Sequence, residues 1–334
     1  MKRKIILDPY GRTLSEIFDP ADLTRLHAMA DVVWGRDEPM PEAEFTQAKT
    51  DAFAIITGRW RYGTVAEMPN LRAILEVGGR HPSPQALDYK ICFAQGIRVL
   101  SCAPAFGPMV AEMALGMVLA ASREIVAGHA AFTEGQEKWL HAGNVNTFTL
   151  YDQMVGLIGY GSLARCLRPL LAPFHCKLQV YDPWLPTTYL ANQGVTPVSL
   201  ETLLETSKVI FVLAIPSAEN KALLGHEQLV RIQPDAVFAL ISRSHLVDFD
   251  ALTELVTAGR FKAAIDVFPQ EPLPLDHPIR KAPGVVLSAH RAGSVAQDLR
   301  NIGRMVVNDL EALLVGLPPL EMQVAQPEIV FRLE

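Results

Sequence analysis

Residues 156–164 read GLIGYGSLA and carry the pattern G-x-G-x-x-A, formed by Gly159, Gly161 and Ala164. The apolar run before this pattern is typical of a strand, and the residues after it are typical of a helix. In such a unit the first glycine allows a tight turn, the second lets the backbone approach a pyrophosphate, and a small third residue keeps strand and helix close. The free N–H groups at the start of the helix would bind the diphosphate. The stretch predicts a nucleotide-binding α/β unit.

An acidic residue follows at the end of the next predicted strand, where Asp182 lies 23 residues after Gly159. A carboxylate at this place accepts hydrogen bonds from the ribose hydroxyls of an adenosine and repels a 2′-phosphate. Pro183 and Trp184 come next, and neither could bind that phosphate. The pattern favours NAD over NADP. Two alternatives remain at this point: an α/β turn with a solvated aspartate, and an S-adenosylmethionine-dependent methyltransferase, which can share a glycine-rich loop and a following acid.

Strand-like and helix-like segments alternate on both sides of this loop. After it, six apolar runs predict the strands of a doubly wound sheet, at residues 155–158, 178–180, 209–213, 237–241, 263–265 and 285–287. Before it, strands are predicted at 5–7, 54–57, 73–75 and 97–100, with a helix over 20–30. Further helices are predicted over 110–125 and 296–315, and the polar stretch 128–150 is predicted to be a connection.

Length and composition agree with a compact two-domain protein. The chain has 334 residues, of which 49% are hydrophobic and 20% charged, so disorder is excluded as its main state. Its net charge of −6 argues against nucleic-acid binding. The apolar runs at 5–7 and 113–121 are too short for a signal peptide and a membrane span. The four cysteines form no CxxC pair. We expect a cytoplasmic protein without a metal site.

Charged side chains follow three of the later predicted strands. Arg243 follows strand 237–241, Asp266 and Glu271 follow strand 263–265, and His290 follows strand 285–287. In open α/β sheets, ligands bind outside the carboxyl ends of the strands. Arg243, Glu271 and His290 are therefore expected to converge on one point.

This set suits hydride transfer between a 2-hydroxy acid and a 2-oxo acid. Removing a hydride from an alcohol carbon requires a base for the hydroxyl proton, and a histidine titrates near neutral pH. Glu271 would orient the imidazole of His290 and stabilise its charged form. Arg243 would bind the substrate carboxylate and polarise the carbonyl oxygen. Taken singly, these residues could equally be a structural histidine, a turn acid and a member of a surface ion pair.

Several segments resemble the D-isomer-specific 2-hydroxyacid dehydrogenase family. The similar pieces are MPNLR at 68–72, GIRVL at 96–100, VAE at 110–112, Trp139, the Gly159 loop, Arg243 with Val247 and Asp248, DVFPQEP at 266–272, and His290. The resemblance implies an α/β fold with two Rossmann-like, doubly wound parallel-sheet domains and the active site in the cleft between them. It implies a substrate domain over 1–111 plus 299–334, an NAD-binding domain over 112–298, and a homodimer.

The resemblance also assigns roles to residues. Arg243, Glu271 and His290 take the catalytic positions, no metal is implied, and the carboxylate of a 2-hydroxy or 2-oxo acid would bind the loop amides of Val77, Gly78 and Gly79 beside Arg80. The residues expected to contact NAD are Gly159, Gly161, Ser162, Leu163, Asp182, Ile215, Pro216, Ile241 and Asp266.

Some positions depart from the family pattern. Ser244 stands where the family usually has glycine, Ala289 where it has proline, and Arg291 where it has a small or apolar residue. In the loop EVGGRHPSP at 76–84, Arg80 or His81 could meet a second acidic group of the substrate, or this turn could simply face solvent. Because the family fold also includes transcriptional corepressors, an NAD-sensing interaction protein with little turnover is the alternative function.

Overall fold

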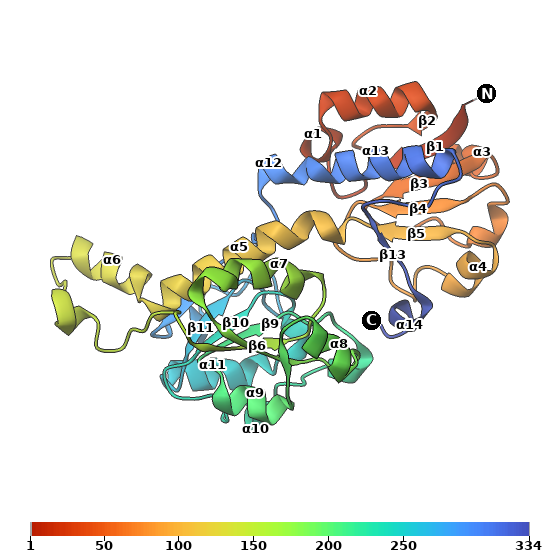
Figure 1. Ribbon diagram of the computed structural model, residues 1–334. Coiled ribbons are helices and arrows are strands. Elements are labelled where there is room, and N and C mark those ends of the chain that lie inside the picture. Colours follow the sequence, from red (N-terminus) through yellow and green to blue (C-terminus); the bar gives the residue numbers. More distant parts are fainter. Residues whose placement is uncertain (1, 334) are drawn as a thin grey trace. The chain divides into compact units, whose positions relative to one another are not determined.

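The computed structural model describes residues 2–333, which divide into two compact units (Figure 1). Unit 1 consists of Met1–Gly107 and Ser294–Glu334, and unit 2 of Pro108–Gly293. The boundaries expected from the resemblance, after 111 and after 298, lie a few residues further along the chain. Each unit has its own mostly parallel sheet covered by helices, so the expected α/β class is confirmed.

The sheet of unit 2 has seven parallel strands in the order β12-β11-β10-β9-β6-β7-β8. The strand order reverses between β6 and β9, which is the switch point where doubly wound sheets bind nucleotides. All six predicted strands are present, and β8 is a two-residue edge strand that was not predicted. The strands are β6 Met154–Ile158, β7 Lys177–Tyr181, β8 Thr196–Pro197, β9 Val209–Val212, β10 Val237–Leu240, β11 Lys262–Ile265 and β12 Val285–Leu287.

Helices cover both faces of this sheet, which explains why β9, β10 and β11 are fully buried. The helices that pack on the body of unit 2 are α5 Ala103–Ser122, which begins in unit 1, α7 Ser162–Leu171, α8 Thr187–Asn192, α9 Leu200–Thr206, α10 His226–Leu229 and α11 Phe249–Thr257, whereas α6 Ile125–Thr133 has no buried residue. Short 3-10 turns lie at Leu140–Gly143, Ala172–Phe174, Ala218–Asn220, Ser244–Leu246 and Pro278–Lys281.

Helix α5 is longer than the 110–125 segment that we predicted, because it starts at Ala103 and includes Pro108. Its length and hydropathy would allow it to cross a membrane, but 56% of its most apolar window is buried inside the protein. Ala114, Met117 and Val118 are among its buried residues in the hydrophobic core of unit 2. The apolar composition of α5 is therefore explained by packing.

The sheet of unit 1 has the order β13-β5-β4-β3-β1-β2, in which only β13 is antiparallel. Apart from β13, this is the second common doubly wound order. Strands β2 and β13 lie at the edges and were not predicted, because β2 is only partly buried and β13 has two residues. The strands are β1 Arg3–Asp8, β2 Ala30–Trp34, β3 Ala52–Thr57, β4 Ala73–Glu76, β5 Arg98–Ser101 and β13 Gln323–Val324.

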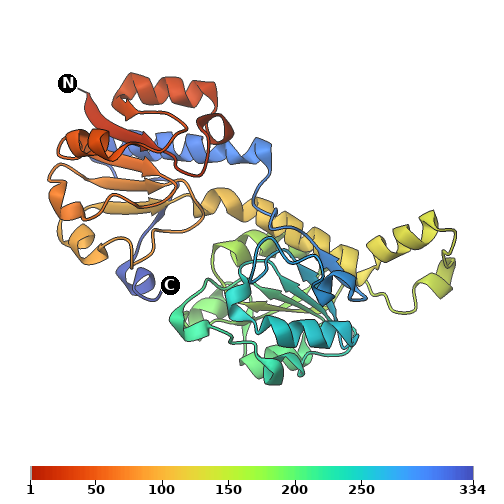
Figure 2. The same ribbon diagram turned by 180° about the vertical axis from the view of Figure 1, so that it is seen from behind.

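Helices α2 and α13 lie side by side on one face of this sheet (Figures 1 and 2). Gly303 in α13 is required by packing, since a Cβ there would lie 2.5 Å from the carbonyl oxygen of Ile17. The predicted helix 296–315 is interrupted at Arg300. The helices are α1 Leu14–Ile17, α2 Pro20–Met29, α3 Glu42–Ala48, α4 Tyr89–Ala94, α12 Ala296–Leu299, α13 Asn301–Leu314 and α14 Pro327–Val330, with a 3-10 turn at Val65–Glu67.

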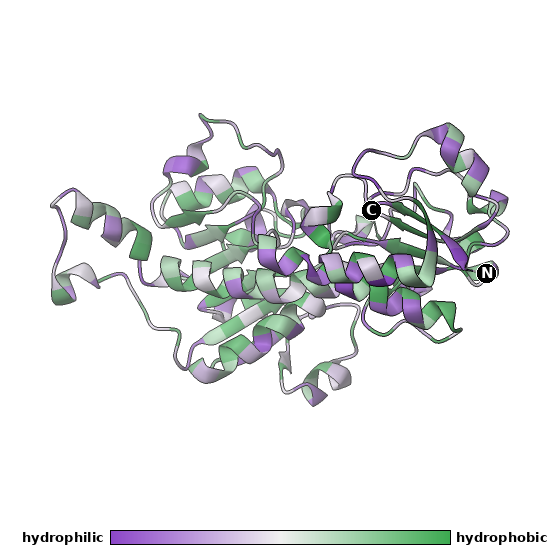
Figure 3. Cartoon of the chain, turned by 90° about the horizontal axis from the view of Figure 1, so that it is seen from above, coloured by the Kyte–Doolittle hydropathy of each residue, from purple (hydrophilic) through white to green (hydrophobic). Residues whose placement is uncertain are grey.

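Residues 125–146 form an arm that leaves the body of unit 2 (Figure 1). We predicted a connection over 128–150, whereas the first part of the arm is helix α6. Figure 3 shows hydrophobic residues on the arm as well as in the buried strands. Phe132 and Trp139 are 59% and 68% exposed, and their rings pack edge to face at 6.3 Å. The arm thus exposes apolar surface that unit 2 does not cover.

Candidate active site

The loop after β6 has the geometry that its glycines predict. Gly159 has φ +92°, and a Cβ there would lie 2.7 Å from the backbone of Ala214. A Cβ on Gly161 would meet no atom within 4 Å. Gly161 is the N-cap of α7. The turn is therefore closed against the chain after β9 and open above Gly161, which leaves room for a diphosphate at the start of the helix.

Asp182 directly follows β7 and lies beside this loop. Its Oδ2 accepts the N–H of Tyr160 at 2.8 Å, and its Oδ1 accepts the N–H of Trp184 at 2.9 Å. These bonds fix the carboxylate, and each oxygen retains a lone pair for a ribose hydroxyl. The loop and Asp182 together fit the adenosine diphosphate half of NAD.

The other residues expected to contact NAD follow strands of the same sheet or begin a helix on it. Ser162 and Leu163 are the first residues of α7. Ile215 is 43% exposed beyond β9 next to Pro216, whereas Ile241, beyond β10, is 3% exposed and belongs to the core. Their contacts with NAD remain predictions.

Arg243, Glu271 and His290 follow β10, β11 and β12, which are neighbours in the sheet. The Nδ1 of His290 lies 2.6 Å from Oε2 of Glu271, and Oε1 of Glu271 accepts the N–H of Phe268 at 3.0 Å. Burial opposes ionisation of Glu271, but the hydrogen bonds from His290 and Phe268, with the charges of His290 and Arg243, lower its pKa. Glu271 is thus an anion held against the imidazole.

The loop that carries His290 is held by Asp266. The His290 N–H donates to the Asp266 carbonyl oxygen at 2.8 Å, and the Asp266 carboxylate accepts the N–H groups of Arg291 and Ala292 at 3.1 and 3.2 Å. Asp266 is 1% exposed, whereas the His290 side chain is 41% exposed. The sequence predicted Asp266 as an NAD contact and did not reveal this bracing role. The NAD contact remains a prediction.

Two further features surround this pair. Arg243 donates from Nη1 to the carbonyl oxygen of Ser242 at 2.7 Å, and Ser244, which follows, begins a 3-10 turn without a positive φ. Serine at that position therefore introduces no backbone strain. A hollow of about 610 Å³ adjoins the pair, lined by Phe268, Glu271, Pro272, Leu273, Arg280, Leu287, Ser288, Ala289 and His290.

In unit 1, the predicted substrate loop follows β4. The N–H of Val77 donates to the carbonyl oxygen of Thr57 at 2.9 Å, so this amide is already used inside the sheet. Within residues 2–333, the N–H groups of Gly78 and Gly79 make no backbone hydrogen bond. Neither amide is therefore used inside the sheet, although the Gly78 N–H interacts with the side chain of Glu76.

His81 and Arg80 differ in this loop. A ring nitrogen of His81 lies 2.9 Å from the carbonyl oxygen of Gln323, which ties the loop to β13. Burial lowers the pKa of His81, and the contact with Gln323 opposes that shift. Arg80 is exposed. Of the two basic side chains, Arg80 is the one free to meet a ligand.

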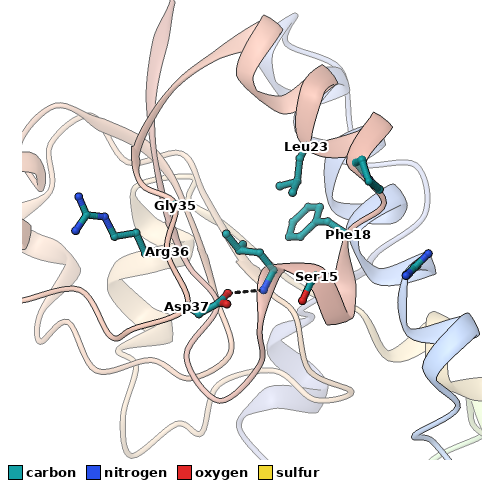
Figure 4. Close-up of a pocket in the computed structure, with 9 residues that line it drawn as sticks. Ser15, Phe18, Leu23, Gly35, Arg36 and Asp37 are labelled. Atoms are coloured by element: carbon teal, nitrogen blue, oxygen red, sulfur yellow. Dashed lines mark hydrogen bonds between the residues drawn. The ribbon is translucent and has the colours of Figure 1, made fainter.

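Another hollow, of about 470 Å³, lies among α1, α2 and the chain after β2 (Figure 4). Asp37 accepts the N–H of Leu14 at its rim at 2.7 Å. None of the predicted site residues lines this hollow. No cluster of three or more His, Cys, Asp or Glu side chains suited to a metal occurs in the described part of the chain.

Comparison with known proteins gives concordant matches. Residues 115–292 match the family model described as D-isomer specific 2-hydroxyacid dehydrogenase, NAD binding domain. A glyoxylate reductase of Thermofilum pendens is 29% identical over 92% of both chains. A D-3-phosphoglycerate dehydrogenase of Mycobacterium bovis is 28% identical over 75% of this chain and 47% of its own length. The crystal structure of a phosphoglycerate oxidoreductase from Rhizobium etli superposes with a TM-score of 0.84 at 36% identity, over 97% of this chain and 99% of that one.

Proposed function

Because the chain belongs to the D-isomer specific 2-hydroxyacid dehydrogenase family, we propose that it interconverts a D-2-hydroxy acid and the matching 2-oxo acid through Arg243, Glu271 and His290. Its membership makes it an NAD-dependent 2-hydroxyacid dehydrogenase with NAD as cofactor. NAD supplies or accepts the hydride when it is bound, and Gly159, Gly161 and Asp182 would hold its adenosine diphosphate half.

In the proposed mechanism, His290 transfers the proton of the substrate oxygen. Protonated His290 donates to the carbonyl oxygen during reduction, and neutral His290 accepts the hydroxyl proton during oxidation. Glu271 stabilises the imidazolium because its carboxylate lies 2.6 Å from Nδ1, which leaves Nε2 for the substrate. Arg243 polarises the carbonyl oxygen and stabilises the charge that develops on it.

We propose that the substrate carboxylate binds the amides of Gly78 and Gly79 and the guanidinium of Arg243. Backbone N–H groups that donate to no carbonyl oxygen are well suited to an anion, and a guanidinium offers two parallel donors. The remaining part of the substrate sets specificity. Names of similar proteins suggest two candidates, glyoxylate and the oxidised form of 3-phosphoglycerate, which differ by a phosphate-bearing chain.

The observation that carries this proposal is the His290–Glu271 pair at the ends of neighbouring strands. An NAD-sensing protein without turnover has no use for a preformed proton donor with its charged partner. The complete set of Arg243, Glu271 and His290 therefore speaks against that alternative.

The test is NADH oxidation, followed by absorbance, with glyoxylate, hydroxypyruvate, pyruvate, phenylpyruvate and phosphohydroxypyruvate. We expect turnover of at least one of these acids, and a loss of about 10²-fold or more in His290→Ala. Activity that survives in His290→Ala would remove His290 as the proton donor. If none of these acids led to NADH oxidation although NADH still bound, the NAD-sensing alternative would be favoured.

We also propose a homodimer formed through the arm over 125–146. The arm exposes Phe132, Trp139 and Leu140, the last at 86%, and a monomer would leave this apolar surface in water. Sedimentation should give a dimer, and Trp139→Asp with Leu140→Asp should give a monomer.

We propose the cytoplasm as the location of the protein, in keeping with four free cysteines.

A further inference from the structure

Glu76 is a buried carboxyl group at the base of the loop that we assign to substrate binding. It is the last residue of β4, directly before Val77, and it is 4% exposed. Its Oε2 is buried without a hydrogen-bond partner in the described part of the chain. Its Oε1 lies 3.1 Å from where a Cβ of Gly78 would be. The Gly78 N–H also interacts with this carboxyl group, so Glu76 already engages one of the two amides that we assign to the substrate.

Other polar side chains occupy the same level of the sheet. Glu76 pairs in register with Thr57 of β3 and with Ser101 of β5, and Thr57 pairs with Asp8 of β1. Asp8 has a cation, because its Oδ2 accepts bonds from Arg61 at 2.8 Å and from the Tyr62 hydroxyl at 2.6 Å. Glu76 forms no ion pair within residues 2–333. Glu76 is thus a buried acid without a bonded cation, whereas Asp8 at the same level of the sheet is paired with Arg61.

A buried carboxyl group without a cation bonded to it favours its neutral form, because the ion loses its hydration. Burial raises the pKa of Glu76 to about 8, although the Gly78 amide and the charge of Arg80 both oppose the rise. The titratable and charged groups that face it are Arg80 in its own loop, Tyr89 from α4 and Cys102 at the start of α5, and Cys102 in turn is influenced by Arg12 and Asp309.

The two charge states of Glu76 have opposite effects on the loop. The neutral acid adds no charge and accepts the Gly78 N–H only weakly, so an external anion can displace it. The ionised carboxylate accepts the same N–H and repels a second carboxylate a few ångströms away. The chain's own side chain and the substrate would then compete for one donor.

We propose that Glu76 is a positioning residue that admits the substrate carboxylate to the Gly78 and Gly79 amides while it is neutral and excludes it when ionised. This inference rests on the proposed function of the loop. It predicts that substrate binding weakens in alkaline solution for a reason separate from the proton transfer at His290. The effect belongs in KM, since Glu76 does not touch the reacting carbon.

The test compares wild type with Glu76→Gln, which keeps the shape and cannot ionise. We would measure kcat and KM for the best 2-oxo acid with saturating NADH between pH 6 and 9.5. The His290 contribution is common to both proteins and cancels in their ratio. We expect the kcat/KM ratio of Glu76→Gln to wild type to be constant up to pH 7 and to rise about tenfold by pH 9, through KM.

Asp8→Asn is the matched control, because it removes another buried carboxylate two strands away in the same row. Its ratio to wild type should not rise with pH. A constant ratio for Glu76→Gln across the whole pH range would overturn the inference while leaving the dehydrogenase intact. A fall in kcat alone would do the same.

Binding of oxamate, an unreactive carboxylate, to the NADH complex provides a second measurement that needs no turnover. The Kd of oxamate can be followed by NADH fluorescence. Between pH 7 and 9, the Kd of wild type should rise by a factor about ten times larger than the Kd of Glu76→Gln. If no 2-oxo acid is turned over, the proposed function fails and oxamate still tests Glu76. If Glu76→Gln does not fold, Glu76→Ser replaces it, and identical oxamate profiles would refute the inference.

Discussion

The carboxylates at the strand ends of the two units are held in different ways. In unit 2, Asp182, Asp266 and Glu271 each use both oxygens as acceptors of backbone or imidazole donors. In unit 1, Asp8 has one oxygen without a partner and Glu76 has another. The hydrogen bonds of the first group orient loops and a histidine. Glu76 has a charge that pH can change.

The difference shows that position at a strand end does not by itself determine the role of an acid. What decides is the number of donors that reach its oxygens, since a carboxylate that accepts several hydrogen bonds is stabilised as an ion. The Glu271 pKa is lowered by such bonds, whereas burial dominates at Glu76 and raises its pKa to about 8. Four substitutions test this contrast.

The largest expected effect is on the stability of Glu76→Gln as a function of pH. The pKa of Glu76 rises from 4.5 to about 8 on folding, so its contribution is fully present below pH 4.5 and is lost as pH rises through 8. Wild type should lose up to a few kcal/mol from this group between pH 5 and 9. In urea unfolding, the free energy of unfolding of Glu76→Gln should increase relative to that of wild type between pH 5 and 9.

Asp8→Asn again provides the comparison. It deprives Arg61 and Tyr62 of their shared acceptor, which should cost about 1–3 kcal/mol. We expect this loss at pH 6 and at pH 9 alike. If Glu76→Gln instead lowered stability equally at every pH, Glu76 would be an ordinary buried hydrogen-bonding group.

Glu271→Gln should have the next largest effect, on the reaction. The amide cannot stabilise the imidazolium of His290, so kcat/KM should fall about 10²-fold, or about 2.7 kcal/mol. NADH affinity serves as the control and should not change. A loss of less than twofold would contradict the role of Glu271.

Lys262→Met tests a buried cation that, unlike the Glu76 carboxyl group, has both an ion-pair partner and a hydrogen-bond acceptor. Lys262 is 8% exposed, and its Nζ lies 2.8 Å from Glu124 and 2.5 Å from the carbonyl oxygen of Asn146. These residues stand at the two ends of the arm, so the lysine holds its base. We expect a loss of about 1–2 kcal/mol, faster proteolysis within 125–146 and a weaker dimer. Unchanged proteolysis would show that the arm is held by other contacts.

The sequence predicted the central strands of both sheets and the three charged residues after β10, β11 and β12, because continuous apolar runs and strand ends are local signals. It missed β2, β8 and β13, which are short or partly exposed edge strands. It did not reveal the bracing role of Asp266, since the amides of Arg291 and Ala292 reach it from 25 and 26 residues away. The sequence did not predict a role for Glu76 either, because the lack of a hydrogen-bond partner at its Oε2 is visible only in three dimensions.

Arg80→Ala should have the smallest effect and connects the two properties of the loop. The Arg80 side chain is exposed, so an ion pair with a second acidic group of the substrate would contribute about 0–1 kcal/mol. We expect kcat/KM to fall up to about fivefold for phosphohydroxypyruvate and not at all for glyoxylate. If Arg80→Ala left kcat/KM unchanged for every accepted substrate, this turn would simply face solvent.

The same substitution should also change the alkaline limit of substrate binding. Because the positive charge of Arg80 lowers the pKa of Glu76, its removal should let Glu76 stay neutral to higher pH. The rise of KM should therefore begin at higher pH in Arg80→Ala than in wild type. Arg72→Ala is the matched control, since Arg72 is an exposed arginine directly before β4 and at its opposite end. If both variants shifted the profile equally, net charge alone would explain the shift, and the coupling between Arg80 and Glu76 would be absent.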